Sequence, residues 1–90
     1  MYTIMEFEFD QQKSEANKKK HGISFEEAQS LWQDSYRILI PAKNLDEPRF
    51  VLISKIQGKY WSAVYTVREN KIRLISVRRS RKNEKEIYEG

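Results

Sequence analysis

The chain begins MYTIMEFEFD, and hydrophobic and acidic residues alternate along residues 5–10 of it. Met5, Phe7 and Phe9 fall on one face of an extended segment, and the acidic residues fall on the other. A period of two is typical of a half-buried strand. The acidic side chains could bind a divalent cation. They could instead belong to an edge strand, where charged side chains discourage pairing with a further strand. We expect the edge strand.

The next segment, residues 11–21, is polar but rich in good helix formers, and it contains no proline or glycine. We predict a helix here, with Asp10 as its N-cap and Gly22 in a left-handed conformation just past its end. So polar a helix has little hydrophobic reason to dock. Asn17 and His21, four residues apart and thus on one face, are predicted to supply polar contacts to the rest of the protein.

A second helix is predicted to begin at Ser24, because Ser24 and Glu27 have the spacing of a capping box. This helix is expected to end near Asp34. Its apolar residues form one stripe that should pack on a sheet, namely Phe25, Ala28, Leu31 and Trp32.

The second half of the chain is rich in β-forming residues. Residues 36–40 have strand composition, Pro41 is expected to end that strand, and a polar loop follows over residues 41–48. Gln57-Gly58 and Glu69-Asn70 suit tight hairpin turns between the segments that come next. These segments are predicted to form an antiparallel meander of strands over residues 49–56, 59–68 and 71–79.

The chain is predicted to end in a short charged helix, with Ser80 as its N-cap and Ile87 and Tyr88 as its anchors. The layout indicates an α+β fold, with an N-terminal strand and two helices followed by a twisted antiparallel sheet and a short C-terminal helix. Because the meander strands are apolar on both faces, we expect packing on each side of the sheet. Ninety residues, of which 39% are hydrophobic, supply one modest core, so we expect a single domain over residues 1–90.

The sequence has no long apolar run and no signal peptide, so we expect a soluble cytoplasmic protein without a membrane partner. Its charge is uneven. Residues 71–82 carry a charge of +6 and no acid, which leaves the remainder of this +4 chain at −2. Such a run is either a solvated face or a surface that binds phosphates.

The residue types exclude several kinds of active site. One histidine, no cysteine and no regularly spaced carboxylates do not form a zinc or calcium signature. Three scattered glycines cannot form a phosphate-binding loop, and the parts of a catalytic triad are missing. We therefore expect no metal and no cofactor.

Cleavage of RNA by its own 2′-hydroxyl remains possible, because it needs only acids, bases and cations from side chains. Histidine suits the proton transfers and arginine suits the charged phosphorane, since its planar fork donates to two oxygens. Aromatic side chains could stack on unpaired bases, and the candidates are Tyr60, Trp61, Tyr65 and Tyr88.

Each candidate also has a structural interpretation. His21 could simply complete the helix dipole. Arg73 could be paired with a glutamate of the first strand. Tyr65 and Trp61 lie in mid-strand and could belong to the core, while Tyr88 could dock the last helix.

The order of residues resembles that of the BrnT toxins over essentially the whole chain. The N-terminal pattern runs from Phe-Glu-aromatic-Asp through Lys-His-Gly to Phe-Glu-Glu-Ala, and the second half ends in Ile-Arg-x-Ile-Ser-x-Arg-Arg. The matching residues of the N-terminal pattern are Phe7, Glu8, Phe9, Asp10, Lys13, Asn17, Lys20, His21, Gly22, Ile23, Phe25, Glu26, Glu27, Ala28 and Asp34.

The resemblance implies a RelE-like ribonuclease that cleaves RNA without a metal, as the toxin of a type II toxin-antitoxin pair. It also implies a hetero-oligomer with a BrnA-like antitoxin that carries a ribbon-helix-helix DNA-binding domain. Two alternatives stay open, a nucleic-acid-binding module without catalysis and a toxin of the same fold that targets DNA gyrase.

The candidate site follows from the matched positions, the basic run and the aromatic residues. His21 would transfer protons. Phosphorane stabilisation is assigned to Arg73, Arg78 and Arg79. RNA binding is assigned to Lys20, Arg49, Arg81, Lys82, Tyr65 and Tyr88.

Overall fold

The computed structural model describes residues 6–42 and 47–90. Met5 of the first predicted strand and residues 43–46 of the predicted polar loop lie outside the described residues. The elements, in chain order, are β1 (Glu6–Glu8), α1 (Gln11–His21), α2 (Phe25–Ala28), the 3-10 helix η1 (Gln29–Gln33), β2 (Ile38–Ala42), β3 (Arg49–Ile56), β4 (Lys59–Arg68), β5 (Lys71–Arg79) and α3 (Lys82–Glu89).

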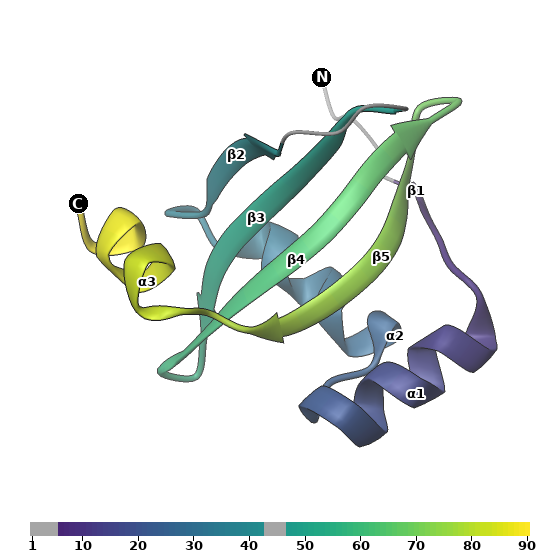
Figure 1. Cartoon of the computed structure of the whole chain (residues 1–90), viewed down its shortest axis with the longest axis horizontal. Coiled ribbons are helices and arrows are strands. Elements are labelled where there is room, and N and C mark those ends of the chain that lie inside the picture. Colours follow the sequence, from purple (N-terminus) through teal and green to yellow (C-terminus); the bar gives the residue numbers. More distant parts are fainter. Residues whose placement is uncertain (1–5, 43–46) are drawn as a thin grey trace.

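The strands form one five-stranded sheet in the order β1-β5-β4-β3-β2. β2 to β5 make the predicted antiparallel meander, and β1 adds a parallel pair at the edge, with Glu8 opposite Arg73. Helix α2 lies behind the sheet, α1 lies beyond the β5 edge, and α3 lies beside β3 (Figure 1). The predicted α+β class and the order of its elements are confirmed.

The first two predicted helices are confirmed together with their end signals. The Asp10 side chain accepts hydrogen bonds from the first turn of α1, and Gly22 ends it at φ 85°, in the left-handed region where glycine is favoured. Ser24 and Glu27 form the capping box, and the second helix changes to the 3-10 form of η1 before ending at Asp34.

Two predicted element ends are wrong. β2 continues through Pro41, which lies opposite Phe50. Proline is tolerated there because β2 is an edge strand and needs no N–H on its open side. Ser80 is not the N-cap of α3, because its hydroxyl lies 2.8 Å from that of Ser62. Arg81 takes the cap position instead, and its backbone N–H donates to the Glu84 carboxylate.

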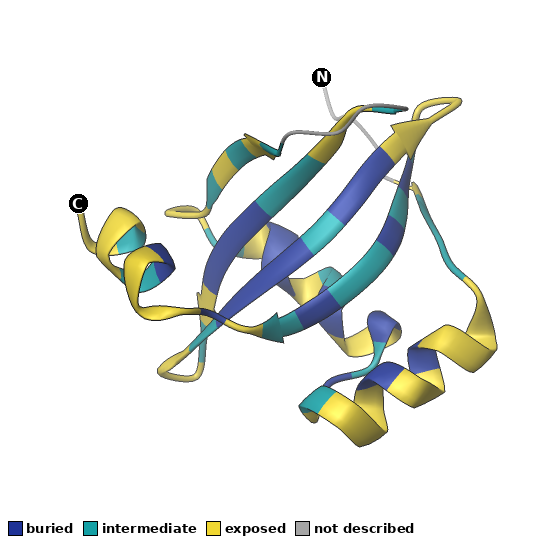
Figure 2. Ribbon diagram, in the orientation of Figure 1, coloured by how far each residue is buried: buried dark blue, intermediate teal, exposed yellow. Residues whose placement is uncertain are grey.

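The core lies between one face of the sheet and the helices α2 and η1. The middle of β4 is buried on both faces of the sheet, with one intermediate position among the buried ones (Figure 2). The hydrophobic core lies on the side that faces α2 and η1. We call this side the helix face. Its buried side chains on the strands are Leu52, Trp61, Ala63, Tyr65, Ile72, Leu74 and Val77, and they pack with the predicted stripe Phe25, Ala28, Leu31 and Trp32.

A bulge in β5 determines which side chains reach each face. Tyr65 pairs with Leu74 but Val64 pairs with Ser76, so Ile75 is left without a partner. Because of this extra residue, Leu74 and Val77 both point to the helix face. Two residues after Val77, Arg79 points to the helix face as well. Arg73 and Arg78 therefore lie on the opposite side, which we call the α3 face. No helix described by the structure is long and apolar enough to cross a membrane.

Candidate functional site

The Asn17 side chain joins α1 to the open edge of β5. Its Nδ2 donates to the carbonyls of Val77 and Ile23, both at 2.8 Å, and its Oδ1 accepts from the Val77 N–H at 3.2 Å. Val77 lies beyond the last residue that β1 pairs with, so the amide of Asn17 takes the place of a neighbouring strand. The predicted docking role of Asn17 is confirmed.

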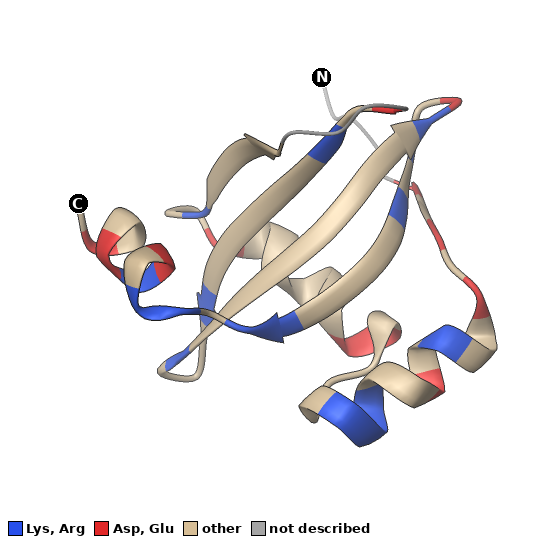
Figure 3. Ribbon diagram, in the orientation of Figure 1, with Lys and Arg blue, Asp and Glu red and all other residues tan. Residues whose placement is uncertain are grey.

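This contact places the end of α1 at the end of β5. Lys20 and His21 lie three and four residues after Asn17, on the same side of the helix. Lys20 is exposed and His21 is half-buried. The His21 side chain makes no hydrogen bond or ion pair with any residue that the structure describes, so the polar contact predicted for it is not seen. The lysines at this end of α1 form a basic group (Figure 3).

Arg79 reaches the helix face at the same end of the sheet. Its guanidinium lies 5.4 Å from the centre of the Trp61 ring, and its Nε donates to the carbonyl of Tyr60 at 3.3 Å. Arg79 is exposed, and none of the ion pairs among the described residues includes it. Its guanidinium therefore has donors free for an anion such as a phosphate.

Arg78 lies on the α3 face and is held by a carboxylate. Its two terminal nitrogens donate to the Glu84 oxygens at 2.7 and 2.9 Å. These hydrogen bonds, followed by others from Arg81 and Ser62, lower the pKa of Glu84 from 4.5 to about 2 although burial opposes the shift. The pair fixes α3 to the sheet.

Arg73 also lies on the α3 face, where its Nη1 is 3.6 Å from Oε1 of Glu8 on β1. Both side chains are partly exposed. The pairing with a glutamate of the first strand, which the sequence left open, is therefore present. Arg79 lies on the helix face, at the end of β5 to which Asn17 joins α1, whereas Arg73 and Arg78 lie on the α3 face.

A cavity of about 290 Å³ opens between the α1–α2 connection and the β3–β4 hairpin. We call it the hairpin cavity. Its lining consists of Gly22, Ile23, Glu27, Ser30, Ile56, Gln57, Lys59 and Trp61. His21 directly precedes Gly22, and Arg79 stacks on Trp61. His21 is thus the chain neighbour of one residue of the cavity wall, and Arg79 packs on another.

The aromatic candidates have mainly structural contacts. Tyr65 is only 3% exposed and packs between Trp32 and Phe50, so neither face of its ring is open to a base. The Tyr88 hydroxyl donates to Asp34 at 2.8 Å, and its ring packs edge-on against Tyr60. Burial, together with the Asp34 carboxylate, raises the pKa of Tyr88 to about 12. Tyr88 therefore docks α3.

The remaining cationic candidates are exposed but lie apart. Arg81 and Lys82 begin α3, close after Arg79. Arg49 begins β3, and its neighbour Phe50 pairs with Tyr65 of β4, whereas Arg79 pairs with Trp61 of β4. The two arginines are therefore about five residues apart along β4, which at about 3.3 Å per residue is roughly 16 Å.

Within residues 6–42 and 47–90, no three His, Cys, Asp or Glu side chains gather as metal ligands would.

Comparison with known proteins agrees with the resemblance in the sequence. The family model described as "Ribonuclease toxin, BrnT, of type II toxin-antitoxin system" matches residues 9–84. This span includes α1, the whole meander and the beginning of α3, and thus every wall of the hairpin cavity. No curated protein matches the chain. Because the family model covers most of its length, the chain belongs to the BrnT family of ribonuclease toxins of type II toxin-antitoxin systems.

Proposed function

We propose that this protein is an endoribonuclease that needs no metal, and that its active centre is formed by His21 and Arg79 beside the hairpin cavity. The observation that carries the proposal is the Asn17 contact with Val77, which fixes the end of α1 against the end of β5. The end of α1 carries a histidine whose side chain has no partner among the described residues, and the end of β5 carries an arginine outside their ion pairs.

The chemistry of this centre is attack by the RNA's own 2′-hydroxyl on the adjacent phosphate. The 2′-hydroxyl must lose a proton, the phosphorane gains negative charge, and the leaving 5′-oxygen takes up a proton. Imidazole can accept and donate protons near neutral pH, so His21 serves the proton transfers. The Arg79 guanidinium donates to the phosphorane oxygens.

The other cations have different roles in this proposal. Lys20, Arg81 and Lys82 are exposed near the same end of the sheet and hold backbone phosphates. Arg73 and Arg78 are engaged by carboxylates and support the fold instead. Arg49 is too far from Arg79 to share its phosphate, so it can contact only a more distant part of the RNA.

A type II toxin is paired with a protein antitoxin. We infer that the antitoxin is BrnA-like, with a ribbon-helix-helix domain, and that the unopposed toxin cleaves cellular RNA and stops translation and growth. The support is the ordered match of the N-terminal and C-terminal patterns to the family.

The first prediction concerns cleavage of bare RNA by purified protein in the presence of EDTA. The parent protein should cleave. We expect His21→Ala to lower the rate about 10²- to 10⁴-fold, because it removes the proton-transfer group. Arg79→Ala should lower it about 10²- to 10³-fold, with partial recovery in Arg79→Lys. Arg73→Ala is the comparison, since it also removes a cation from β5, and it should stay within about tenfold of the parent.

Thermal unfolding of each variant separates lost chemistry from lost folding. Parental rates in both His21→Ala and Arg79→Ala would show that the active centre lies elsewhere. Salt-sensitive RNA binding without products would instead indicate a binding module. Arrested growth with intact RNA and impaired supercoiling would indicate a gyrase toxin.

A further inference from the structure

The hairpin cavity is lined mainly by polar groups, with three apolar side chains in its wall. Ile23 and Trp61 are buried side chains of the core cluster, and Ile56 packs against that cluster. The volume of about 290 Å³ is close to the lower limit for small-molecule sites. Such a space suits one planar ring system rather than a large ligand.

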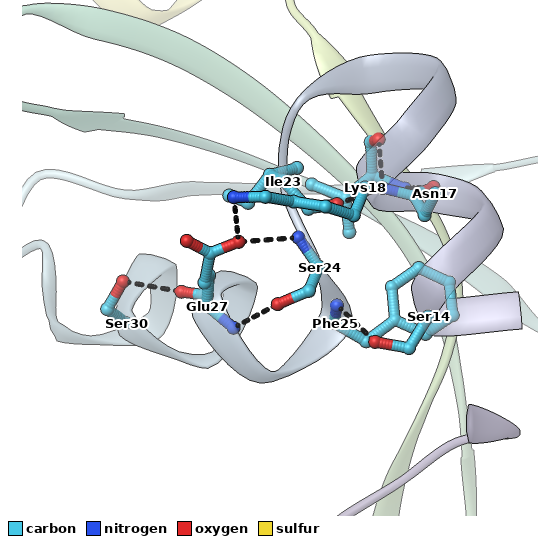
Figure 4. A network of polar contacts seen from close by, with 9 residues as sticks. Ser14, Asn17, Lys18, Ile23, Ser24, Phe25, Glu27 and Ser30 are labelled. Atoms are coloured by element: carbon cyan, nitrogen blue, oxygen red, sulfur yellow. Dashed lines mark hydrogen bonds and ion pairs between the residues drawn. The ribbon is translucent and has the colours of Figure 1, made fainter. Parts of the chain in front are cut away.

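Glu27 contributes a fixed anion to the lining. Its Oε1 accepts from Lys18 Nζ at 2.7 Å and from the Ser24 N–H at 2.9 Å (Figure 4). Its Oε2 has no hydrogen bond among the described residues. The hydrogen bond from Lys18, followed by that from Ser24, lowers the pKa of Glu27 from 4.5 to about 2. The carboxylate is therefore ionised at any physiological pH and has one oxygen available as an acceptor.

Lys59 contributes a cation to the same lining. It is exposed at the start of β4, and none of the ion pairs among the described residues involves it. Lys59 and Trp61 are two residues apart on β4, so both side chains point to the helix face. The cavity thus offers an acceptor on the α2 wall and a donor on the hairpin wall.

We propose that the hairpin cavity binds the nucleobase next to the scissile phosphate and prefers guanine. Guanine alone presents two donors, N1–H and N2–H₂, on one edge and two acceptors, O6 and N7, on another. In this proposal the N1–H and N2–H₂ groups donate to the Glu27 carboxylate, and O6 and N7 accept from the Lys59 ammonium group. The inference deepens the proposed function, because the base would sit beside His21 and Arg79.

Binding of nucleoside monophosphates tests the cavity without requiring catalysis. The 3′- and 5′-monophosphates of all four nucleosides are titrated into the full chain, and affinities are measured by calorimetry. We expect the guanosine compounds to bind at least about tenfold more tightly than the other three. Because each correct polar pair discriminates by about 1–3 kcal/mol, Glu27→Gln and Lys59→Ala should each reduce this preference about tenfold or more.

Each cavity variant has a control with the same change of charge. Glu26→Gln removes the adjacent carboxylate, which does not line this cavity, and Lys13→Ala removes a cation from the far end of α1. Both should keep the parental preference. Unfolding temperatures within a few degrees of the parent show that Glu27→Gln retains its cap.

Mapping of cleavage sites on a mixed-sequence RNA provides the second arm. The parent should cut next to guanine, and Lys59→Ala should cut with a weaker base preference. Equal binding of all four bases, or a guanine preference unchanged in both cavity variants, would overturn the assignment. Guanosine binding without any RNA cleavage would keep the cavity assignment but defeat the proposed nuclease, so the two failures can be told apart.

Discussion

Arg78 and Arg79 are adjacent in the sequence, yet their side chains lie on opposite faces of the sheet. Arg78 is held by Glu84 on the α3 face, and Arg79 stacks on Trp61 on the helix face. The bulge at Ile75 decides which of them reaches which face. In a regular strand every second side chain points to the same face, so without the bulge Arg78, four residues after Leu74, would lie on the helix face. The sequence could therefore identify the two arginines as candidates but could not separate their roles.

Glu84 shows what sequence analysis missed at the residue scale. It is one of several acids in the last helix, but only 9% of its surface is exposed, and it accepts hydrogen bonds from Arg78, Arg81 and Ser62. Its importance depends on tertiary contacts, and no local pattern signals it. A serine before a short helix is an N-cap signal, but Ser80 is instead drawn into this buried polar group.

The second prediction follows from the lowered pKa of Glu84. A carboxylate whose pKa falls from 4.5 to about 2 on folding stabilises the protein above pH 4.5 and loses that contribution as the pH falls toward 2. The contribution is at most about 3 kcal/mol. Denaturant unfolding between pH 6 and pH 2 should show a weaker acid loss of stability in Glu84→Gln than in the parent. Glu86→Gln, an exposed change on the same helix, should follow the parent, and identical acid slopes for all three proteins would refute the assignment.

At the scale of elements, most of the fold could be predicted from local signals. The bounds of α1 and of β3, β4 and β5 agree with the prediction, because caps and hairpin turns mark their ends. Gln57 and Gly58 both have positive φ, as do Glu69 and Asn70, which is the backbone that tight hairpins require. The parallel pairing of β1 with β5 could not be predicted, since it joins strands that are more than sixty residues apart.

α1 shows how a helix without an apolar face is held in place. Its two buried side chains are both polar. Ser14 accepts from the Phe25 N–H at 2.9 Å and ties α1 to α2, whereas Asn17 ties it to β5. Both contacts stabilise the helix, but only the second joins the half of α1 that carries His21 to β5.

The third prediction uses this pair as variant and control. Asn17→Ala and Ser14→Ala should each lower the free energy of unfolding by about 1–3 kcal/mol, because each leaves buried backbone groups without partners. Asn17→Ala should in addition lower kcat for RNA cleavage about 10- to 100-fold with little change in KM, since a small displacement of a catalytic group is costly. The rates are measured well below both unfolding temperatures. Equal kcat values in the two variants would mean that Asn17 is not a positioning residue.

At the scale of the whole molecule, the two faces of the sheet carry arginines in different surroundings. The α3 face holds the carboxylate-paired arginines and the docked last helix, and the helix face ends in the hairpin cavity with Trp61 and Arg79. The sequence predicted packing on both sides of the sheet. This is confirmed by α2, which packs with the core on one face, and by Glu84 of α3, which contacts Ser62 and Arg78 on the other. The sequence also located the basic run of residues 71–82. It could not show that α1, whose end is basic as well, is joined to β5 within this run (Figure 3).

The measurement that tests the account most directly is the chemistry of the RNA ends after cleavage in EDTA. If side chains at this end of the molecule promote attack by the 2′-hydroxyl, the products carry 2′,3′-cyclic phosphates and 5′-hydroxyls, and a 2′-deoxy substitution at the cleaved position abolishes the cut. Products with 5′-phosphates, or cleavage that persists at a 2′-deoxy position, would contradict it.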